Sequence, residues 1–183
     1  MELDGFGIAI MAAGKGTRLK SKRPKVLHEI GGRKLLEHVI AAAKTLVPAE
    51  NIYCIVGHEA ERVQAAVAST GVKFVPQPDQ RGTGHALQMV KAYFELSGEA
   101  LPRNLLVLSG DVPLIRPETI RAICEVHLAE NAAMTILTAE PEDPTGYGRV
   151  LRTGSGPEVR AIVEQKSLRP EHGDPPEINS GIY

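Results

Sequence analysis

Short runs of apolar residues alternate along this chain with longer stretches in which apolar residues recur every three or four positions. The runs predict buried β-strands at residues 6–10, 52–56, 72–75, 105–108 and 132–139. The longer stretches predict helices at residues 35–46, 63–67 and 83–94 and from Pro117 onward. Strands that alternate with helices are joined by right-handed crossovers. The pattern therefore predicts an α/β fold with a doubly wound, mostly parallel sheet of the Rossmann-like type.

The pattern changes after residue 140. Residues 141–148 are rich in turn-forming residues, two short alternating runs follow at 149–152 and 159–164, and 167–177 is polar and proline-rich, as in a loop or lid. We therefore expect a first part at 1–140 and a second, turn-rich part at 141–183. The final residues, 178–183, resemble the middle of a strand, so we expect the chain to be the truncated piece of a longer domain.

Composition and charge exclude several classes of protein. The chain has 183 residues, 43% of them hydrophobic, and 21 basic residues against 22 acidic ones, which predicts a globular protein without a dedicated nucleic-acid or membrane surface. No apolar stretch has transmembrane length and no signal pattern opens the chain, so we expect a cytoplasmic protein. Cys54, Cys124 and six scattered histidines lack the spacing of a redox pair or zinc site.

The first predicted strand runs into a loop that suits a nucleoside triphosphate. Small residues there let backbone N–H groups approach phosphate oxygens, and nearby cations neutralise the remaining charge. The small residues are Ala12, Ala13, Gly14 and Gly16, and the cations are Lys15, Arg18 and Lys25. The spacing fits neither a Walker A motif nor a dinucleotide fingerprint. An ordinary tight turn would also explain the glycines, but the cations favour phosphate binding.

Two further loops follow predicted strands. In residues 77–85, Gln77 carries a donor and an acceptor that match a pyrimidine edge, although a helix-capping loop would also explain the segment. In residues 109–113, the carboxylate of Asp111 suits Mg²⁺, although it could instead cap a turn. Because the strands are predicted to be parallel, we expect the three loops to converge on one edge of the sheet.

Six segments together resemble the sugar-nucleotide pyrophosphorylases, and specifically the uridylyltransferase domains of bacterial N-acetylglucosamine-1-phosphate uridylyltransferases. They are MAAGKGTRLKSKRPKVLHEIGG (11–32), QPDQRGTGHAL (77–87), LSGDVPLI (108–115), PTGYGRVLR (144–152), AIVEQK (161–166) and EINSGIY (177–183). The first is shared across the superfamily, and the others narrow the resemblance toward this branch. The resemblance spans nearly the whole chain.

The resemblance implies a role for particular residues. It assigns triphosphate binding to Ala12, Ala13, Gly14, Gly16 and Thr17, and catalytic charge neutralisation to Arg18 and Lys25. It assigns uracil recognition to Gln77, Gly82 and Thr83, the Mg²⁺ cofactor to Asp111, and the amino sugar to Gly148, Glu164 and Asn179. The second part, 141–183, is then the start of a sugar-binding part.

The implied reaction is Mg²⁺-dependent transfer of UMP from UTP to N-acetylglucosamine 1-phosphate, which gives UDP-N-acetylglucosamine and pyrophosphate for peptidoglycan and lipopolysaccharide synthesis. Another sugar phosphate or nucleotide, or a non-catalytic binding module, stays open as an alternative. In the family, a second Mg²⁺ ligand and a C-terminal acetyl-transferring β-helix follow the last matched segment. A homo-oligomer formed through that further domain is expected on the same ground.

Overall fold

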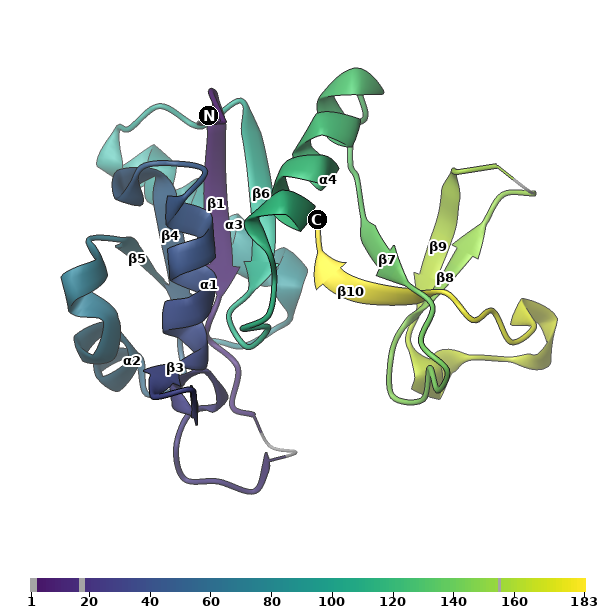
Figure 1. Cartoon of the computed structure of the whole chain (residues 1–183), viewed down its shortest axis with the longest axis horizontal. Coiled ribbons are helices and arrows are strands. Elements are labelled where there is room, and N and C mark those ends of the chain that lie inside the picture. Colours follow the sequence, from purple (N-terminus) through teal and green to yellow (C-terminus); the bar gives the residue numbers. More distant parts are fainter. Residues whose placement is uncertain (1–2, 17–18, 155) are drawn as a thin grey trace. The chain divides into compact units, whose positions relative to one another are not determined.

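The computed structural model describes residues 3–16, 19–154 and 156–183. Its internal contacts group the chain into two compact units, Met1–Glu125 and Val126–Tyr183 (Figure 1). The division lies inside a helix and ahead of residue 141, where the composition changes.

The first unit is built on a four-stranded parallel sheet. Its strands are β1 (Phe6–Met11), β4 (Ile52–Val56), β5 (Lys73–Pro76) and β6 (Asn104–Ser109), in the order β5-β4-β1-β6. Every residue of β4 is buried, as its uninterrupted apolar sequence predicts. The chain adds strands on one side of β1 and then crosses to add β6 on the other. Between β1 and β6 the strand order therefore reverses, which is where open α/β sheets bind ligands.

Helices cover both faces of this sheet. They are α1 (Leu35–Lys44), α2 (Ala60–Val67), α3 (Thr83–Ser97) and α4 (Pro117–Ala129). In Figure 1, α1 and α2 lie in front of the strands and α3 lies behind them. Ala9 of β1 belongs to the same buried cluster as Val90 and Phe94 of α3. On α1, Leu36 and Ile40 are among the buried residues. The predicted doubly wound α/β fold is confirmed.

Short elements complete the first unit. They are the 3₁₀ turns η2 (Lys25–Leu27), η3 (Ala49–Asn51) and η4 (Ala68–Thr70) and the small hairpin of β2 (Glu29–Ile30) and β3 (Arg33–Lys34). No described helix in either unit combines the length and the apolar character that a membrane crossing requires.

The second unit is an antiparallel sheet. Its strands are β7 (Leu137–Ala139), β8 (Arg149–Arg152), β9 (Val159–Val163) and β10 (Ile178–Ile182), in the order β7-β10-β8-β9. The 3₁₀ turns η5 (Gln165–Ser167) and η6 (Pro170–His172) lie within the polar segment between β9 and β10. Arg152 Nε donates to Glu177 Oε2 at 2.7 Å. This hydrogen bond lowers the pKa of the Glu177 carboxyl.

The strand expected at 132–139 is shorter than predicted and has an unexpected partner. Only Leu137–Ala139 is extended, and it pairs antiparallel with β10 rather than joining the parallel sheet. The preceding residues are held at the end of α4, where the Ala132 N–H donates to the His127 carbonyl at 3.2 Å and Thr135 Oγ1 lies 3.0 Å from His127 Nδ1. In the residues before Leu137, these local contacts replace the strand-to-strand hydrogen bonds that the apolar run predicts.

Both cysteines are buried in the folded chain. Burial raises the pKa of Cys54 to about 12 and that of Cys124 to about 11, and both are unpaired. Because the thiolate is the nucleophile, we expect iodoacetamide at pH 8 to label neither cysteine in the native protein and both in denaturant, as read by intact mass. Native labelling at the rate of a free thiol would contradict this expectation.

Candidate active site

A cavity of about 620 Å³ opens in the first unit at the carboxyl ends of β1, β5 and β6. It is lined by Met11, Ala13, Gly14, Gly16, Leu19, Lys25, Val26, Gln77, Gln80, Gly82, Thr83, Ala86, Ser109 and Asp111. These residues come from all three loops that the sequence singled out. The predicted convergence of the loops on one edge of the sheet is therefore confirmed.

The loop after β1 forms one wall of the cavity. Gly14 has open space where a side chain would project, so a ligand can approach its backbone. Gly16 has φ +61°, and a Cβ there would lie 2.7 Å from Lys25 Cβ, so a side chain at this position would displace Lys25. Ala12 is buried, and its N–H already donates to the Ile55 carbonyl at 2.9 Å. Of the four small residues predicted to bind phosphate here, Ala13, Gly14 and Gly16 line the cavity.

The predicted positions Thr17 and Arg18 lie outside the described residues. Lys15 lies in the loop but is not among the residues that line the cavity.

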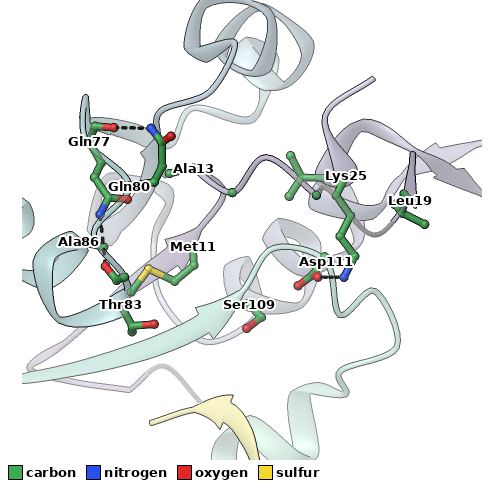
Figure 2. A pocket seen from close by; sticks show the side chains of 14 residues that line it. Met11, Ala13, Leu19, Lys25, Gln77, Gln80, Thr83, Ala86, Ser109 and Asp111 are labelled. Carbon is green, nitrogen blue, oxygen red and sulfur yellow. Dashed lines mark hydrogen bonds and ion pairs between the residues drawn. The ribbon is translucent and has the colours of Figure 1, made fainter. Parts of the chain in front are cut away.

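A lysine and an aspartate form an ion pair in the cavity. Lys25 begins η2, where Pro24 fixes the backbone and Val26 and Leu27 are buried. Asp111 follows β6 after Gly110, whose N–H donates to the Met11 carbonyl at 3.0 Å. A Cβ on Gly110 would lie 2.8 Å from that carbonyl oxygen, so glycine allows the close approach that places Asp111. Lys25 Nζ pairs with Asp111 Oδ2, as Figure 2 shows.

Gln77 occupies the opposite side of the cavity (Figure 2). Its side chain is buried, and among the described residues Arg149 is the other polar residue with this burial. Gln77 Nε2 donates to the Gly82 carbonyl at 3.3 Å and lies 3.1 Å from His85 Nδ1. A buried amide in a ligand-sized cavity is suited to forming specific hydrogen bonds with the polar edge of a ligand.

The start of α3 lies beside Gln77. Gly82, with φ +99°, is the N-cap and has no side chain that could bond to the helix. Thr83 is the first helical residue. The N–H groups of a first helical turn have no partner within the helix. Gly82 and Thr83 both line the cavity, so this helix end faces the ligand space.

Sequence reasoning missed Gln80, His85 and Ser109. Gln80 Nε2 donates to the Gln77 carbonyl at 3.2 Å and to the Pro78 carbonyl at 3.1 Å, so it fixes the loop that carries Gln77. All three residues stand inside the motifs quoted above. Their contacts depend on how the loops fold, which the motifs do not specify.

The three residues expected to contact a sugar lie together in the second unit. The Asn179 N–H donates to the Gly148 carbonyl at 2.9 Å, and a Cβ on Gly148 would lie 3.5 Å from Glu164 Oε1. The Asn179 side chain is fixed as well, because its Nδ2 donates to the Tyr183 hydroxyl at 2.6 Å. Adjacent strands β8 and β10, and the end of β9, bring these residues together.

The described residues contain no group of three or more His, Cys, Asp or Glu that could enclose a metal ion. Among the described residues that line the cavity, Asp111 is the one with a carboxylate, so it is the ligand that a metal there would use. Mg²⁺ commonly binds through one or two carboxylates and keeps phosphate and water ligands, so this donor set fits it.

Comparison with known proteins identifies the family. The MobA-like NTP transferase domain matches residues 8–171. "Bifunctional protein GlmU" of Koribacter versatilis is 56% identical over 182 residues, covering 97% of this chain and 37% of that protein. The protein of the same name in Streptomyces coelicolor is 45% identical over 178 residues, covering 96% and 36%. The chain thus spans a little over a third of the length of these curated relatives.

The fold has a close counterpart among solved structures. The structure described as mannose-1-phosphate geranyltransferase from Thermus thermophilus superposes with a TM-score of 0.75 at 25% identity, covering 97% of this chain and 56% of that one. With the family match over residues 8–171, these similarities show that the chain belongs to the MobA-like NTP transferase domain family and is a nucleotidyltransferase domain.

Proposed function

We propose that this domain transfers UMP from UTP to N-acetylglucosamine 1-phosphate, releasing pyrophosphate and forming UDP-N-acetylglucosamine. One observation carries the proposal: a single cavity combines an open glycine loop, a Lys25–Asp111 ion pair and a buried Gln77. Its volume of about 620 Å³ suits a nucleotide-sized ligand. The similarity to GlmU proteins and the family match support a sugar-phosphate nucleotidyltransferase. The choice of UTP and N-acetylglucosamine 1-phosphate rests on the resemblance of the six segments to N-acetylglucosamine-1-phosphate uridylyltransferases.

In this proposal the triphosphate lies along the loop after β1. The backbone of Ala13, Gly14 and Gly16 is close to the cavity, and backbone N–H groups in such loops bind phosphate oxygens. Lys25 adds a cation on the same wall, and the charge-neutralising role that the resemblance implies for Arg18 stays a prediction. The base lies toward Gln77, Gly82 and Thr83 at the start of α3.

Asp111 would hold Mg²⁺, which supplies positive charge to the phosphates when bound. Lys25 and Asp111 form an ion pair in the cavity. A bound triphosphate offers Lys25 a polyanion in place of one carboxylate, and this frees Asp111 for a cation. The ion pair therefore places in the cavity one positive charge for the phosphates and one negative charge for the metal ion.

The chemistry needs positioning and charge neutralisation. The phosphate oxygen of the sugar phosphate attacks the α-phosphorus of UTP in line with the departing pyrophosphate. This oxygen is already an anion, so no general base has to remove a proton from it. Lys25 offsets the repulsion between the two polyanions, and this type of stabilisation accounts for most of the catalysis in phosphoryl transfer. Gly148, Glu164 and Asn179 would hold the amino sugar.

Pyrophosphate release with a panel of substrates tests the proposal. UTP and CTP are each combined with the 1-phosphates of N-acetylglucosamine, glucose and mannose, with and without Mg²⁺. We expect the highest kcat/KM for UTP with N-acetylglucosamine 1-phosphate and none without Mg²⁺. A higher kcat/KM for another pair would assign the domain to that pair. Nucleotide binding without pyrophosphate release from any pair, measured on the complete domain, would favour a binding module.

A further inference from the structure

We propose that His85 is a positioning residue that fixes the direction of the Gln77 side-chain amide and so determines the choice between uracil and cytosine. The inference rests on the proposed function, in which Gln77 faces the base. It starts from one contact, the 3.1 Å approach of Gln77 Nε2 to His85 Nδ1.

The protein fixes every part of Gln77 except the rotation of its terminal amide. Its backbone N–H donates to the Val56 carbonyl at 2.7 Å, and its carbonyl accepts from Gln80 Nε2 at 3.2 Å. The residue is only 4% exposed. What is left to specify is whether the amide presents its oxygen or its NH₂ group to the cavity.

Two acceptors on the protein side decide that rotation. The Gly82 carbonyl, 3.3 Å from Nε2, can only accept a hydrogen bond. A neutral histidine with its proton on Nε2 also offers Nδ1 as an acceptor. Both hydrogens of the Gln77 NH₂ group are then directed at the protein, and the amide oxygen is the group presented to the ligand.

An amide oxygen that faces position 3 of a pyrimidine distinguishes the two bases. Uracil has an N–H there, which donates to the oxygen. Cytosine has a lone pair there, which repels it. If the amide turned over, its NH₂ group would instead favour cytosine. Without His85, the Gly82 carbonyl is the one acceptor among the described residues that opposes this rotation, and uracil selectivity is weakened.

His85 is well placed to hold this role because it lies in the first turn of α3. The next residue, Ala86, is buried in the cluster that contains Val90 and Phe94, so the helix start is anchored to the sheet. His85 itself is partly exposed and can be replaced without opening the core.

The test measures the dissociation constants of UTP and CTP by calorimetry and compares the ratio Kd(CTP)/Kd(UTP). We expect His85→Leu to lower the ratio about fivefold to tenfold, the worth of one neutral hydrogen bond. His85→Asp, which can only accept, should keep the ratio within about twofold, because its charge repels both triphosphates alike. Gln88→Ala, at an exposed position of the same helix, should change neither constant.

Gln77→Ala separates failure of this inference from failure of the proposed function. A changed ratio in Gln77→Ala with an unchanged ratio in His85→Leu overturns the role of His85 and leaves the proposed function standing. An unchanged ratio in Gln77→Ala removes Gln77 from base recognition and overturns the uracil site itself. A readout on the unsubstituted protein is the histidine ¹H–¹⁵N spectrum. A proton on His85 Nδ1 at neutral pH would overturn the inference, and its absence supports it.

Discussion

Replacing Lys25 with methionine or Asp111 with asparagine is expected to lower kcat for nucleotidyl transfer by about 10²- to 10³-fold, the usual cost of losing one preorganised charge in an active site. Both side chains line the cavity and pair with each other. In the proposed reaction Lys25 offsets phosphate charge directly, and Asp111 would do so through the Mg²⁺ that it holds. No other described side chain lining the cavity is charged. The substitutions keep the approximate volume, so the change is one of charge.

Stability measurements separate this effect from a structural one. The Lys25 side chain is 42% exposed and that of Asp111 27%, and exposed ion pairs contribute about 0–1 kcal/mol. We therefore expect both variants to unfold within about 1 kcal/mol of the parent in urea. Lys91→Ala, which removes an exposed lysine of α3, is the matched control. Near-parental kcat in either variant would remove that residue from the mechanism.

The double variant adds a further check. The effects of substituting residues that act together on the same charges are not additive. The loss of kcat in the double variant should therefore be smaller than the product of the losses in the two single variants. Full additivity would mean that Lys25 and Asp111 serve separate steps.

The parallel sheet and its ligand edge could be predicted from the sequence because the signals are local. Buried strands read as continuous apolar runs, as at Ile52–Val56, and a loop after each parallel strand must end at the same edge. The position of Gly14, Lys25, Gln77 and Asp111 around one cavity follows from that topology.

Contacts between loops could not be predicted in the same way. Two examples are the contact of His85 with Gln77 and the hydrogen bond from the Ala12 N–H to the Ile55 carbonyl. Each depends on the conformation of two segments of the chain. The antiparallel pairing of β7 with β10 joins residues about forty positions apart, and the apolar run at 132–139 gave no sign of that partner.

Phe94→Ala is expected to lower the free energy of unfolding by about 3–5 kcal/mol, as for other buried phenylalanines. Phe94 is 5% exposed on α3. Its ring centroid lies 4.9 Å from that of Tyr53 and 5.7 Å from that of Tyr93, in edge-to-face contact with both. The loss combines the transfer of the ring to water, the cavity that remains, and the two aromatic contacts.

Leu96→Ala provides the control for this substitution. Leu96 lies two residues further along the same helix and is 89% exposed, so its replacement should change the free energy of unfolding by less than about 0.5 kcal/mol. Urea unfolding of both variants, followed by circular dichroism, measures the difference. Equal stability of the two variants would contradict the packing described for α3.

Phe94 lies near the C-terminal end of α3, whereas Thr83 and Ala86, which line the cavity, lie near its N-terminal end. The helix is held against the sheet by Ala86, Val90 and Phe94 in one buried cluster. Loss of the last of these should destabilise the domain as a whole while Ala86 and Val90 still hold the helix start in place. We therefore expect the folded Phe94→Ala protein to bind UTP with an affinity within about threefold of the parent, well below the roughly tenfold change that 1.4 kcal/mol at the site would cause. A much larger loss of affinity in the folded variant would mean that the core behind α3, and not only its first turn, sets the geometry of the base site.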